Sequence, residues 1–420
     1  MLAHCSLFAL VLALFTGTAA QTVSSDGGLT SAGEPPRESG QSLLDEVASL
    51  VEQQLYSRAR LDEVGWSAAL SRARAAYASA SESRARTEII RALLAALRVS
   101  HTQLYLRDDP AYWALASIFE PVLIRRCSKD LLPSIPVSRD DVGVHWKQVG
   151  KDWFVGGLYA AGPAEKAGLK LGDRVLAADG RPFSPVQAFW GKAGTSVALR
   201  VQRSREGAPM TITVTPRTAK PQDEYRQSIV DSWRMLEHRG RKIAYLRVWA
   251  WTGVEHQMAV LDAVAQSNAA AADGFVIDLR DGWGGAAPQY LGMFFRDVPV
   301  LESIGRDGKS QIFDQQIRKP TVILINGGTR SGKEVIAYGA KKHHLARLVG
   351  ERTAGAVMAG TPFCLSDGSL LLLAAADVKI DGERLEGRGV APDIEVPFDI
   401  RFAAGRDPQL QRALDVLTGK

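Results

Sequence analysis

The feature that most constrains the fold is an alternation of continuous apolar segments with helical segments between residues 242 and 350. The apolar segments have the length of strands: 242-KIAYLRVWA-250, 274-GFVIDL-279, 321-TVILI-325 and 347-RLVG-350. Between them, apolar residues at helical spacing predict helices at about 255–268, 286–296 and 332–341. Strands that are apolar throughout are typical of a parallel sheet covered on both faces. Residues 218–420 are therefore predicted to form an α/β core with a largely parallel sheet.

Two glycine-rich loops follow two of these strands, 278-DLRDGWGG-285 and 326-NGGTRSGKE-334. In such sheets the functional groups gather on the loops at the carboxyl ends of the strands. Exposed backbone N–H groups next to a helix N-terminus suit a phosphate, and they suit the oxyanion of acyl transfer equally well. The loops therefore predict an anion site at this edge of the sheet.

The second loop nearly matches the nucleotide-binding pattern G-x-x-x-x-G-K-[ST], with Gly327, Gly332 and Lys333 in place. The last position holds Glu334, whose negative charge stands where a hydroxyl should bind Mg²⁺. An apolar strand that ends in Asp, the other usual element, occurs only upstream, in 275-FVID-278. We therefore expect no nucleotide to bind.

Ser331 is the alternative functional residue of this loop. It lies at a strand-to-helix turn, where the helix dipole favours negative charge near its Oγ. The backbone N–H groups of Gly332 and of Gly284 or Gly285 could bind an oxyanion. Arg330 and Lys333 beside the serine could attract acidic substrates, but they are expected to be solvated charges.

A serine nucleophile needs a base. Lys333 is expected to project away from Ser331 once the turn becomes helical. Several histidines are expected in polar, solvated or removed segments: His4, His238, His256, His343 and His344. His101 is singled out because it closes an apolar helix, 85-ARTEIIRALLAALRV-99, although a purely structural role for it is an alternative.

The N-terminus predicts export. The apolar run 6-SLFALVLALF-15 is too short to span a bilayer, and it is followed by small residues that suit cleavage after Ala20. Residues 1–20 are therefore interpreted as a signal peptide, with periplasmic or secreted localisation. Residues 21–41 are rich in Gly, Ser and Pro and are predicted to be a flexible linker. Helical periodicity then predicts a helical N-terminal domain at 42–137.

Composition excludes some classes of function. The chain has 420 residues, of which 46% are apolar, so a large core and two or three domains are expected. A formal net charge of +5 without a long basic run gives no support for nucleic-acid binding. The Cys and His residues show no metal-ligand spacing, so neither a metal nor another cofactor is expected. Cys127 and Cys364 could pair, but unpaired core cysteines are equally compatible with the sequence.

Residues 138–217 differ in sequence pattern from the helical segment before them and from the α/β segment after them. Short strand-like segments alternate there with glycine-rich turns: 142-VGVHW-146, 153-WFVGGLY-159, 174-RVLAADG-180, 197-VALRVQR-203 and 211-TITVTPR-217. The segment 162-GPAEKAGLKLGDRVLAADGRPF-183 resembles a PDZ domain. Such domains bind peptide C-termini by adding a strand to a sheet edge. The resemblance implies that Val142, Gly143 and Val144 begin the peptide-binding loop and strand.

From about residue 42 to 400, the chain resembles the tail-specific, or carboxy-terminal processing, protease family in its tricorn-core-like branch. Three motifs carry the resemblance: 278-DLRDGWGG-285, 325-INGGTRSGKE-334 and 385-LEGRGVAPDIEV-396. One branch of the family takes its base from a lysine after the serine, and Ala356 stands at that position here. The tricorn-like branch takes a histidine that follows an apolar helix, and 95-AALRVSHTQL-104 is similar to that motif at Ser100 and His101.

The resemblance implies an exported serine endopeptidase that acts on peptides or unfolded protein segments. Ser331 is the implied nucleophile and His101 the implied base. Glu386 would orient His101, directly or through Ser100. The alternative is a catalytically inactive scaffold of the same fold that binds peptides through its PDZ-like domain. The oligomeric state is left open by the sequence.

Overall fold

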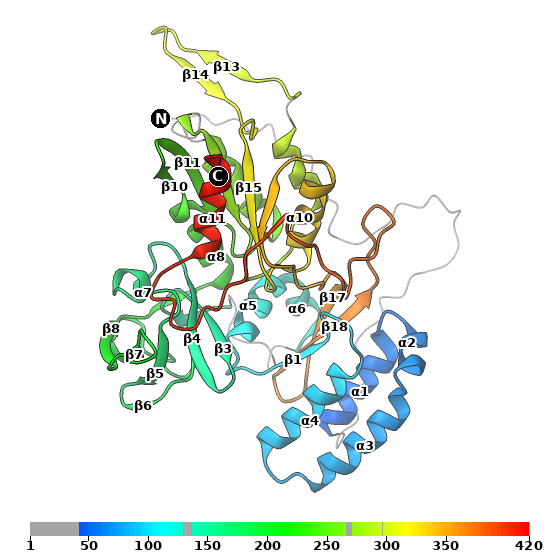
Figure 1. Cartoon of the computed structure of the whole chain (residues 1–420). Helices are drawn as coiled ribbons and strands as arrows, with labels where there is room; N and C mark the ends of the chain where they lie inside the picture. The colour runs from blue at the N-terminus through cyan, green and yellow to red at the C-terminus, as the bar shows by residue number, and fades with distance from the viewer. Residues whose placement is uncertain (1–41, 129–130, 132–136, 266–270, 296, 420) are drawn as a thin grey trace, which may run out of the picture. The chain divides into compact units, whose positions relative to one another are not determined.

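The computed structural model describes residues 42–128, 131, 137–265, 271–295 and 297–419 (Figure 1). These residues belong to one compact unit that spans Glu38–Lys420. The predicted signal peptide and linker lie outside the described residues. No helix of the described part is long and apolar enough to cross a membrane.

The N-terminal region is helical, as the periodicity predicts. Its helices are α1 (Leu43–Gln54), α2 (Arg58–Glu63), α3 (Trp66–Ser79) and α4 (Ser83–Ala95). Ser42 caps α1 by accepting a hydrogen bond from the Asp45 N–H. The buried faces of these helices pack on side chains of two strands far along the chain, β17 (Ala359–Cys364) and β18 (Leu370–Ala376). The helical region therefore shares its core with residues of the predicted protease core.

A short sheet joins the same two parts of the chain. Strand β1 (Gln103–Tyr105) pairs antiparallel with β18, and β18 pairs with β17. Two more helices follow β1, α5 (Pro110–Ile118) and α6 (Glu120–Arg126). A disulfide connects Cys127, at the end of α6, to Cys364 of β17. The pairing that the sequence left open is thus formed.

A β domain follows, bounded by the ribbon of β2 (Arg139–Asp141) and β9 (Arg217–Ala219). Its larger sheet has the order β3-β4-β5-β7-β8, with the short β6 beside β5. The strands are β3 (Val144–Val149), β4 (Asp152–Leu158), β5 (Arg174–Ala178), β6 (Arg181–Pro182), β7 (Val197–Gln202) and β8 (Met210–Val214), and α7 (Pro163–Lys166) follows β4. The domain has its own apolar core, and β3 lies at an edge of the sheet.

The main sheet has the order β10-β11-β12-β15-β16-β19 within the described residues. Its strands are β10 (Arg234–His238), β11 (Arg241–Arg247), β12 (Gly274–Asp278), β15 (Thr321–Ile325), β16 (Arg347–Gly350) and β19 (Ile394–Glu395). β10 and β11 form an antiparallel pair, and the other neighbouring strands pair in parallel. All five residues of β12 and of β15 are buried, which accounts for their continuous apolar sequences.

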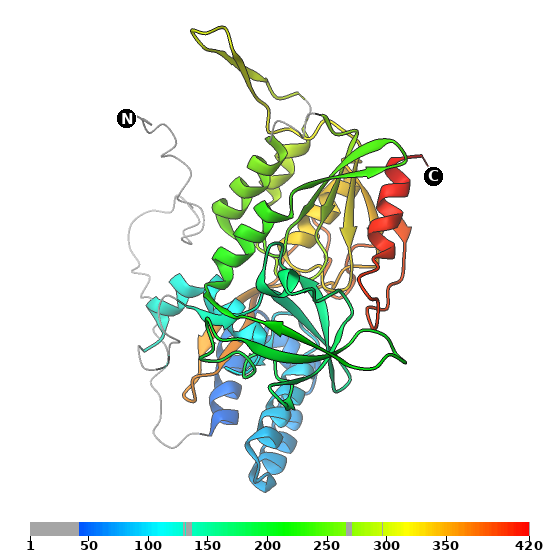
Figure 2. The ribbon, with the colours of Figure 1, turned by 90° about the vertical axis from the view of Figure 1, so that its left-hand side faces the viewer.

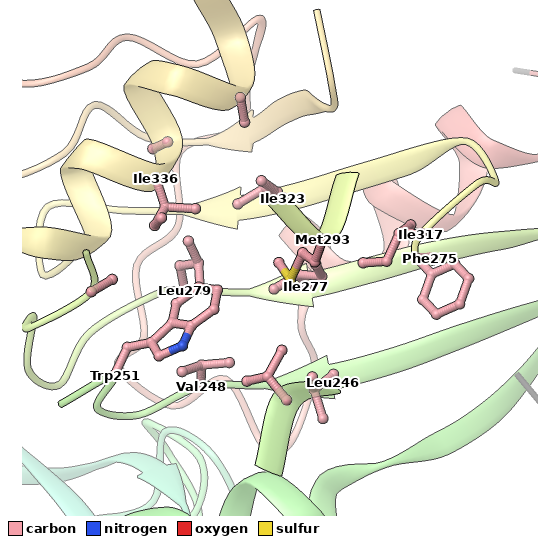
Figure 3. Packing of buried hydrophobic residues seen from close by; sticks show 14 of the residues in the cluster. Leu246, Val248, Trp251, Phe275, Ile277, Leu279, Met293, Ile317, Ile323 and Ile336 are labelled. Atoms are coloured by element: carbon pink, nitrogen blue, oxygen red, sulfur yellow. The ribbon is translucent and has the colours of Figure 1, made fainter. Parts of the chain in front are cut away.

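Helices cover both faces of this sheet (Figure 2). Ile277 and Ile323 point to the face covered by α9 (Gly253–Ala265) and α10 (Gly332–Lys342), where α8 (Pro221–Ser232) also packs (Figure 3). The intervening residues Val276 and Val322 point to the other face, which α11 (Pro408–Leu417) covers. This two-sided burial fixes where the loops after β12 and β15 emerge.

The segment between β12 and β15 differs from the prediction. The helix expected at 286–296 is a 3₁₀ helix, η2 (Pro288–Phe294). A hairpin follows, β13 (Leu301–Ile304) and β14 (Ser310–Phe313), and every residue of β13 is exposed. Neither strand of this hairpin was predicted; the residues of β13 and Ser310, Gln311 and Ile312 of β14 are exposed, so they show no alternation of buried and exposed positions.

Candidate active site

Ser331 lies at the sharp turn between β15 and α10. Its backbone has φ 56° and ψ −132°, a conformation that is rare for residues other than glycine. The Asn326 Oδ1 accepts hydrogen bonds from the backbone N–H groups of Asp281 and Gly328, at 3.0 and 2.9 Å. The Thr329 hydroxyl donates to the Leu279 carbonyl oxygen. The two glycine-rich loops therefore brace each other and hold Ser331 in its turn.

Glu334 occupies the position at which the nucleotide-binding pattern requires Ser or Thr. Its hydrogen bonds explain why a carboxylate stands there. Its buried carboxylate accepts hydrogen bonds from the backbone N–H groups of Ser331, Gly355 and Ala356 and from the Thr353 hydroxyl. Burial raises the pKa of Glu334, while these hydrogen bonds act in the opposite direction. Glu334 thus ties the first turn of α10 to residues 353–356.

Gly284 packs directly against the Ser331 turn. A Cβ at position 284 would collide with the Ser331 Cβ and would lie 2.9 Å from the Gly332 backbone nitrogen. Among the described residues, none accepts a hydrogen bond from the backbone N–H groups of Gly284, Gly285 or Gly332. These donors are therefore free to bind an acceptor beside Ser331.

His101 follows α4 in a tight turn, with φ 53°. Its Nδ1 lies 3.1 Å from the Ser100 Oγ, and the Ser100 hydroxyl donates to the Glu386 carboxylate at 2.8 Å. Glu386 also accepts hydrogen bonds from the backbone N–H groups of Ser100, Val357 and Met358. The contact between Glu386 and His101 is therefore indirect and passes through Ser100.

These hydrogen bonds determine the tautomer of His101. Because Ser100 gives its single hydroxyl hydrogen to Glu386, its oxygen can only accept from the imidazole. The Nδ1 of His101 then carries the proton, and Nε2 keeps a free electron pair. Burial, reinforced by the positive charge of Arg330 and opposed by Glu386, lowers the pKa of His101 to about 4. The imidazole is therefore neutral at physiological pH and can act as a base.

His101 and Ser331 line one cavity of about 250 Å³. Gly284, Gly285 and Ala356 also line it, and its apolar wall is formed by Leu115, Ile118, Phe119, Met358 and Leu372. No direct hydrogen bond joins the side chains of His101 and Ser331 in the described structure. Catalytic contacts of this kind commonly tighten only when substrate binds.

The expectation that Lys333 is solvated is wrong. Its side chain is 0% exposed, and Nζ donates to the carbonyl oxygens of Val248 and Trp249, at 3.1 and 3.2 Å, and of Asp281. Burial lowers the pKa of Lys333 to about 7. Trp249 also accepts a hydrogen bond from the Trp283 N–H. Lys333 therefore fastens α10 to the base of the glycine-rich loop at 281–285.

Two further side chains that were expected to be solvated or in polar surroundings, His256 and Arg330, are buried and half-buried, respectively. His256, expected in polar surroundings, is buried in α9, where its Nδ1 lies 2.7 Å from the Thr252 carbonyl oxygen. Arg330 is half-buried, and its guanidinium carbon lies 5.9 Å from the centre of the Trp283 ring. It lines both the cavity at Ser331 and an adjoining cavity of about 440 Å³.

The adjoining cavity extends to the β domain. Val144, His145 and Trp146 of β3 line it, so the edge strand that begins at Val144 faces this space. Val142 is fully buried, and its carbonyl oxygen accepts from the Ala164 N–H. Gly143 has φ 77°, and its carbonyl oxygen accepts from the Tyr159 N–H. Residues 142–143 are thus a fixed turn that leads into β3.

Asp278 and Arg280 form a buried ion pair that Asp407 extends, so these residues of the first motif serve structure. The sequence did not identify the cavity wall built by α5, β17 and β18. The run 370-LLLLAAA-376 was a signal for a buried element, but its type depends on a partner strand elsewhere in the chain. No cluster of His, Cys, Asp or Glu among the described residues could hold a metal ion.

Comparison with known proteins gives matches over the α/β core and beyond. Residues 242–396 match the family described as peptidase family S41. The carboxyl-terminal-processing protease of Synechocystis sp. is 29% identical over 279 residues, which are 62% of this chain and 64% of the relative. The carboxy-terminal processing protease CtpA of Bacillus subtilis is 24% identical and covers 64% of this chain and 58% of the relative. The matches thus span less than two thirds of the length of these relatives.

Two solved structures share the fold. The tricorn protease superposes with a TM-score of 0.51 over 89% of this chain and 36% of that chain, at 19% identity. Mature CPAF superposes with a TM-score of 0.50 over 90% of this chain and 98% of that chain, at 13% identity. At these identities the likeness concerns the fold.

Proposed function

We propose that this chain, a member of peptidase family S41 that is related to the carboxyl-terminal processing proteases, is a serine endopeptidase. Its substrates would be peptides or unfolded protein segments. One observation carries the proposal: the hydrogen-bonded set of Glu386, Ser100 and His101 adjoins the cavity that Ser331 also lines. Ser100 and Glu386 are 286 positions apart in the chain.

The proposed reaction begins when Nε2 of His101 takes the proton of the Ser331 hydroxyl. The Oγ bonds to the peptide carbonyl carbon, and the carbonyl oxygen becomes an oxyanion. The N–H groups of Gly332 and of Gly284 or Gly285 bind this oxyanion. The imidazolium then protonates the leaving amine as the C–N bond breaks. Water, deprotonated by His101, then attacks the acyl carbon, and the imidazolium returns this proton to the Ser331 Oγ as the ester bond breaks and the acid is released.

Glu386 has a positioning role in this proposal. Its carboxylate accepts the Ser100 hydroxyl, which fixes the proton on Nδ1 of His101. When Nε2 gains a proton, the negative charge of Glu386 stabilises the imidazolium. This attraction acts to raise the pKa of His101. Ser100 connects Glu386 to His101 and so orients the imidazole. Its own hydroxyl neither gains nor loses a proton.

We also propose that the β domain binds peptide segments in the manner of a PDZ domain, with Val142, Gly143 and Val144 at the start of the binding strand. β3 is an edge strand with one neighbour, so it can accept an added strand. Its residues line the cavity that adjoins the one at Ser331. A peptide held on β3 would therefore lie next to the proposed catalytic groups.

Export completes the proposal, with residues 1–20 as a signal peptide and periplasmic or secreted localisation. The disulfide between Cys127 and Cys364 supports it, because disulfides persist mainly in oxidising compartments.

Labelling with a fluorophosphonate tests the function directly. The mature chain should be labelled and should cleave an unfolded protein, and Ser331→Ala should lose both properties. Ser204→Ala, a change at an exposed serine, is the matched control and should retain both. If the wild type binds peptides but is neither labelled nor active, the chain is an inactive scaffold and the proposal is wrong.

A further inference from the structure

Arg330 stands out among the groups around the proposed active site. It is the only Asp, Glu, Lys or Arg side chain that the described structure places on the wall of the cavity at Ser331. It directly precedes Ser331 in the sequence. A positive charge therefore lies beside the nucleophile in a cavity whose other wall is apolar.

No carboxylate of the described residues forms an ion pair with Arg330. Its Nε is buried and has no hydrogen-bond partner there. Buried donors are normally paired, because an unpaired one loses its hydration without compensation. Trp283 packs near the guanidinium and limits the directions that it can take. Arg330 is thus a cation without an ion-pair partner among the described residues, and it lines both cavities.

The other arginines that line the adjoining cavity behave differently. Arg91 pairs with Asp109 at 2.7 Å, and Arg139 pairs with Asp141. Asp109 is thereby already engaged. Asp281 is the other acid of that cavity. Its Oδ2 lies 3.9 Å from a terminal nitrogen of Arg247, and it forms no ion pair with Arg330 in the described structure. Within the same described residues, the Nε atoms of Arg91 and Arg139 also lack a hydrogen-bond partner, so what distinguishes Arg330 among the three arginines of this cavity is the absence of an ion pair.

We propose that Arg330 binds a carboxylate of the substrate peptide, close to the bond that is cleaved. The inference rests on the proposed peptidase function and adds the class of substrate. A guanidinium binds a carboxylate through two parallel hydrogen bonds, which fixes its position better than a point charge does. Because Arg330 adjoins Ser331, the carboxylate lies within a few residues of the scissile bond, next to a residue that suits the apolar wall.

Two sources can supply the carboxylate: the free C-terminus of the substrate, or an Asp or Glu side chain. A peptide series separates them. Each peptide has a small and apolar sequence with one Glu moved through successive positions, a matched Gln version, and either a free or an amidated C-terminus. Cleavage that is favoured by the free terminus identifies the first source, and cleavage that follows the position of Glu identifies the second.

In wild type, kcat/KM should be about tenfold or more higher for the carboxylate peptide than for its neutral match, as expected for a charge-assisted hydrogen bond. Arg330→Gln should remove this preference, and Arg330→Lys should retain part of it. Arg352→Gln, which removes an exposed arginine outside the cavities, should keep the preference. A wild type without the preference, or an Arg330→Gln variant that keeps it, would overturn the proposal.

Binding to Ser331→Ala provides a second readout that does not need hydrolysis. Fluorescently labelled carboxylate peptides should bind about tenfold more tightly than their neutral matches, and the added change Arg330→Gln should equalise them. If this preference holds while no peptide is cleaved by wild type, the peptidase proposal fails and the carboxylate site stands. If peptides are cleaved without any preference in binding or rate, the reverse is true.

Discussion

The two sides of the cavity are built in different ways. The side of the proposed nucleophile Ser331, here called the nucleophile side, comprises residues 278–285 and 326–334, two loops that leave neighbouring strands of one sheet. Lys333 and Glu334 are fully buried there and are surrounded by hydrogen-bond partners. The base side, residues 98–105, 357–360 and 386, is assembled from three distant segments. Ser100 and Glu386 hold it together through a few half-buried contacts.

Because of this difference, effects on stability and effects on activity should be separable. On the nucleophile side, a side chain that positions the loop is also part of the core, so its loss affects folding. On the base side, Ser100 and Glu386 are half-buried, and the loss of their polar contacts should leave the apolar cores intact. Variants on the two sides should therefore divide into those that lower stability and those that lower only the rate.

The largest effect should be equal on both sides. Ser331→Ala and His101→Ala should each lower kcat by about 10⁴-fold or more, because the nucleophile and its base act as a unit. The urea midpoint of each variant should remain close to that of wild type, since neither side chain fills a core. Steady-state kinetics and urea unfolding measure the two quantities. High activity in His101→Ala would show that the base lies elsewhere.

Lys333→Met should sharpen the contrast by lowering stability. The methionine fills a similar volume but leaves three carbonyl oxygens without their donor, so we expect a loss of about 2–4 kcal/mol in the free energy of unfolding. Lys342→Met, in the exposed last turn of the same helix, is the control and should change it by less than about 1 kcal/mol. Equal stabilities in urea would mean that the buried ammonium gives no net stabilisation.

Ser100→Ala should affect rate without stability. Removing the bridge between Glu386 and His101 should lower kcat by about 10–100-fold, as expected for a hydrogen bond to a charged group, while KM stays near its wild-type value. Ser100→Thr keeps the hydroxyl and should restore most of the rate. A KM effect in place of a kcat effect would indicate that Ser100 contacts the substrate.

The smallest effect concerns pH. Because burial and Arg330 lower the pKa of His101 to about 4, the neutral base should persist in wild type until the pH falls to about 4. The charged groups that face His101 are Arg330 and Glu386. Arg330→Gln removes the cation and should raise the acid limb of kcat/KM by less than about one pH unit. Arg352→Gln should not move it, and a downward shift in Arg330→Gln would contradict this electrostatic account.

Sequence alone predicted the nucleophile side better than the base side. The strands at 274–279 and 321–325, the start of a helix at 332 and the loops between them follow from local patterns, and the structure contains each of them. The burial of Lys333 was missed because its acceptors, among them Val248 and Asp281, come from other loops. A lysine is ordinarily exposed, so its own position in the sequence gave no signal.

The base side depends on contacts that local patterns do not contain. β1 is a strand because it pairs with β18, across more than 260 positions, and the sequence around Gln103 gave no strand signal. The role of Ser100 and Glu386 came from resemblance to a family and not from their own residue types.

The long separation between Ser100 and Glu386 has a consequence for the timing of synthesis. The serine turn and the histidine leave the ribosome well before residue 386, which is needed to hold Ser100. In the proposed enzyme, a nascent chain would therefore carry its nucleophile and base for a time without a clamp between them. Chains stalled before residue 386 should resist fluorophosphonate labelling, and completed chains should react.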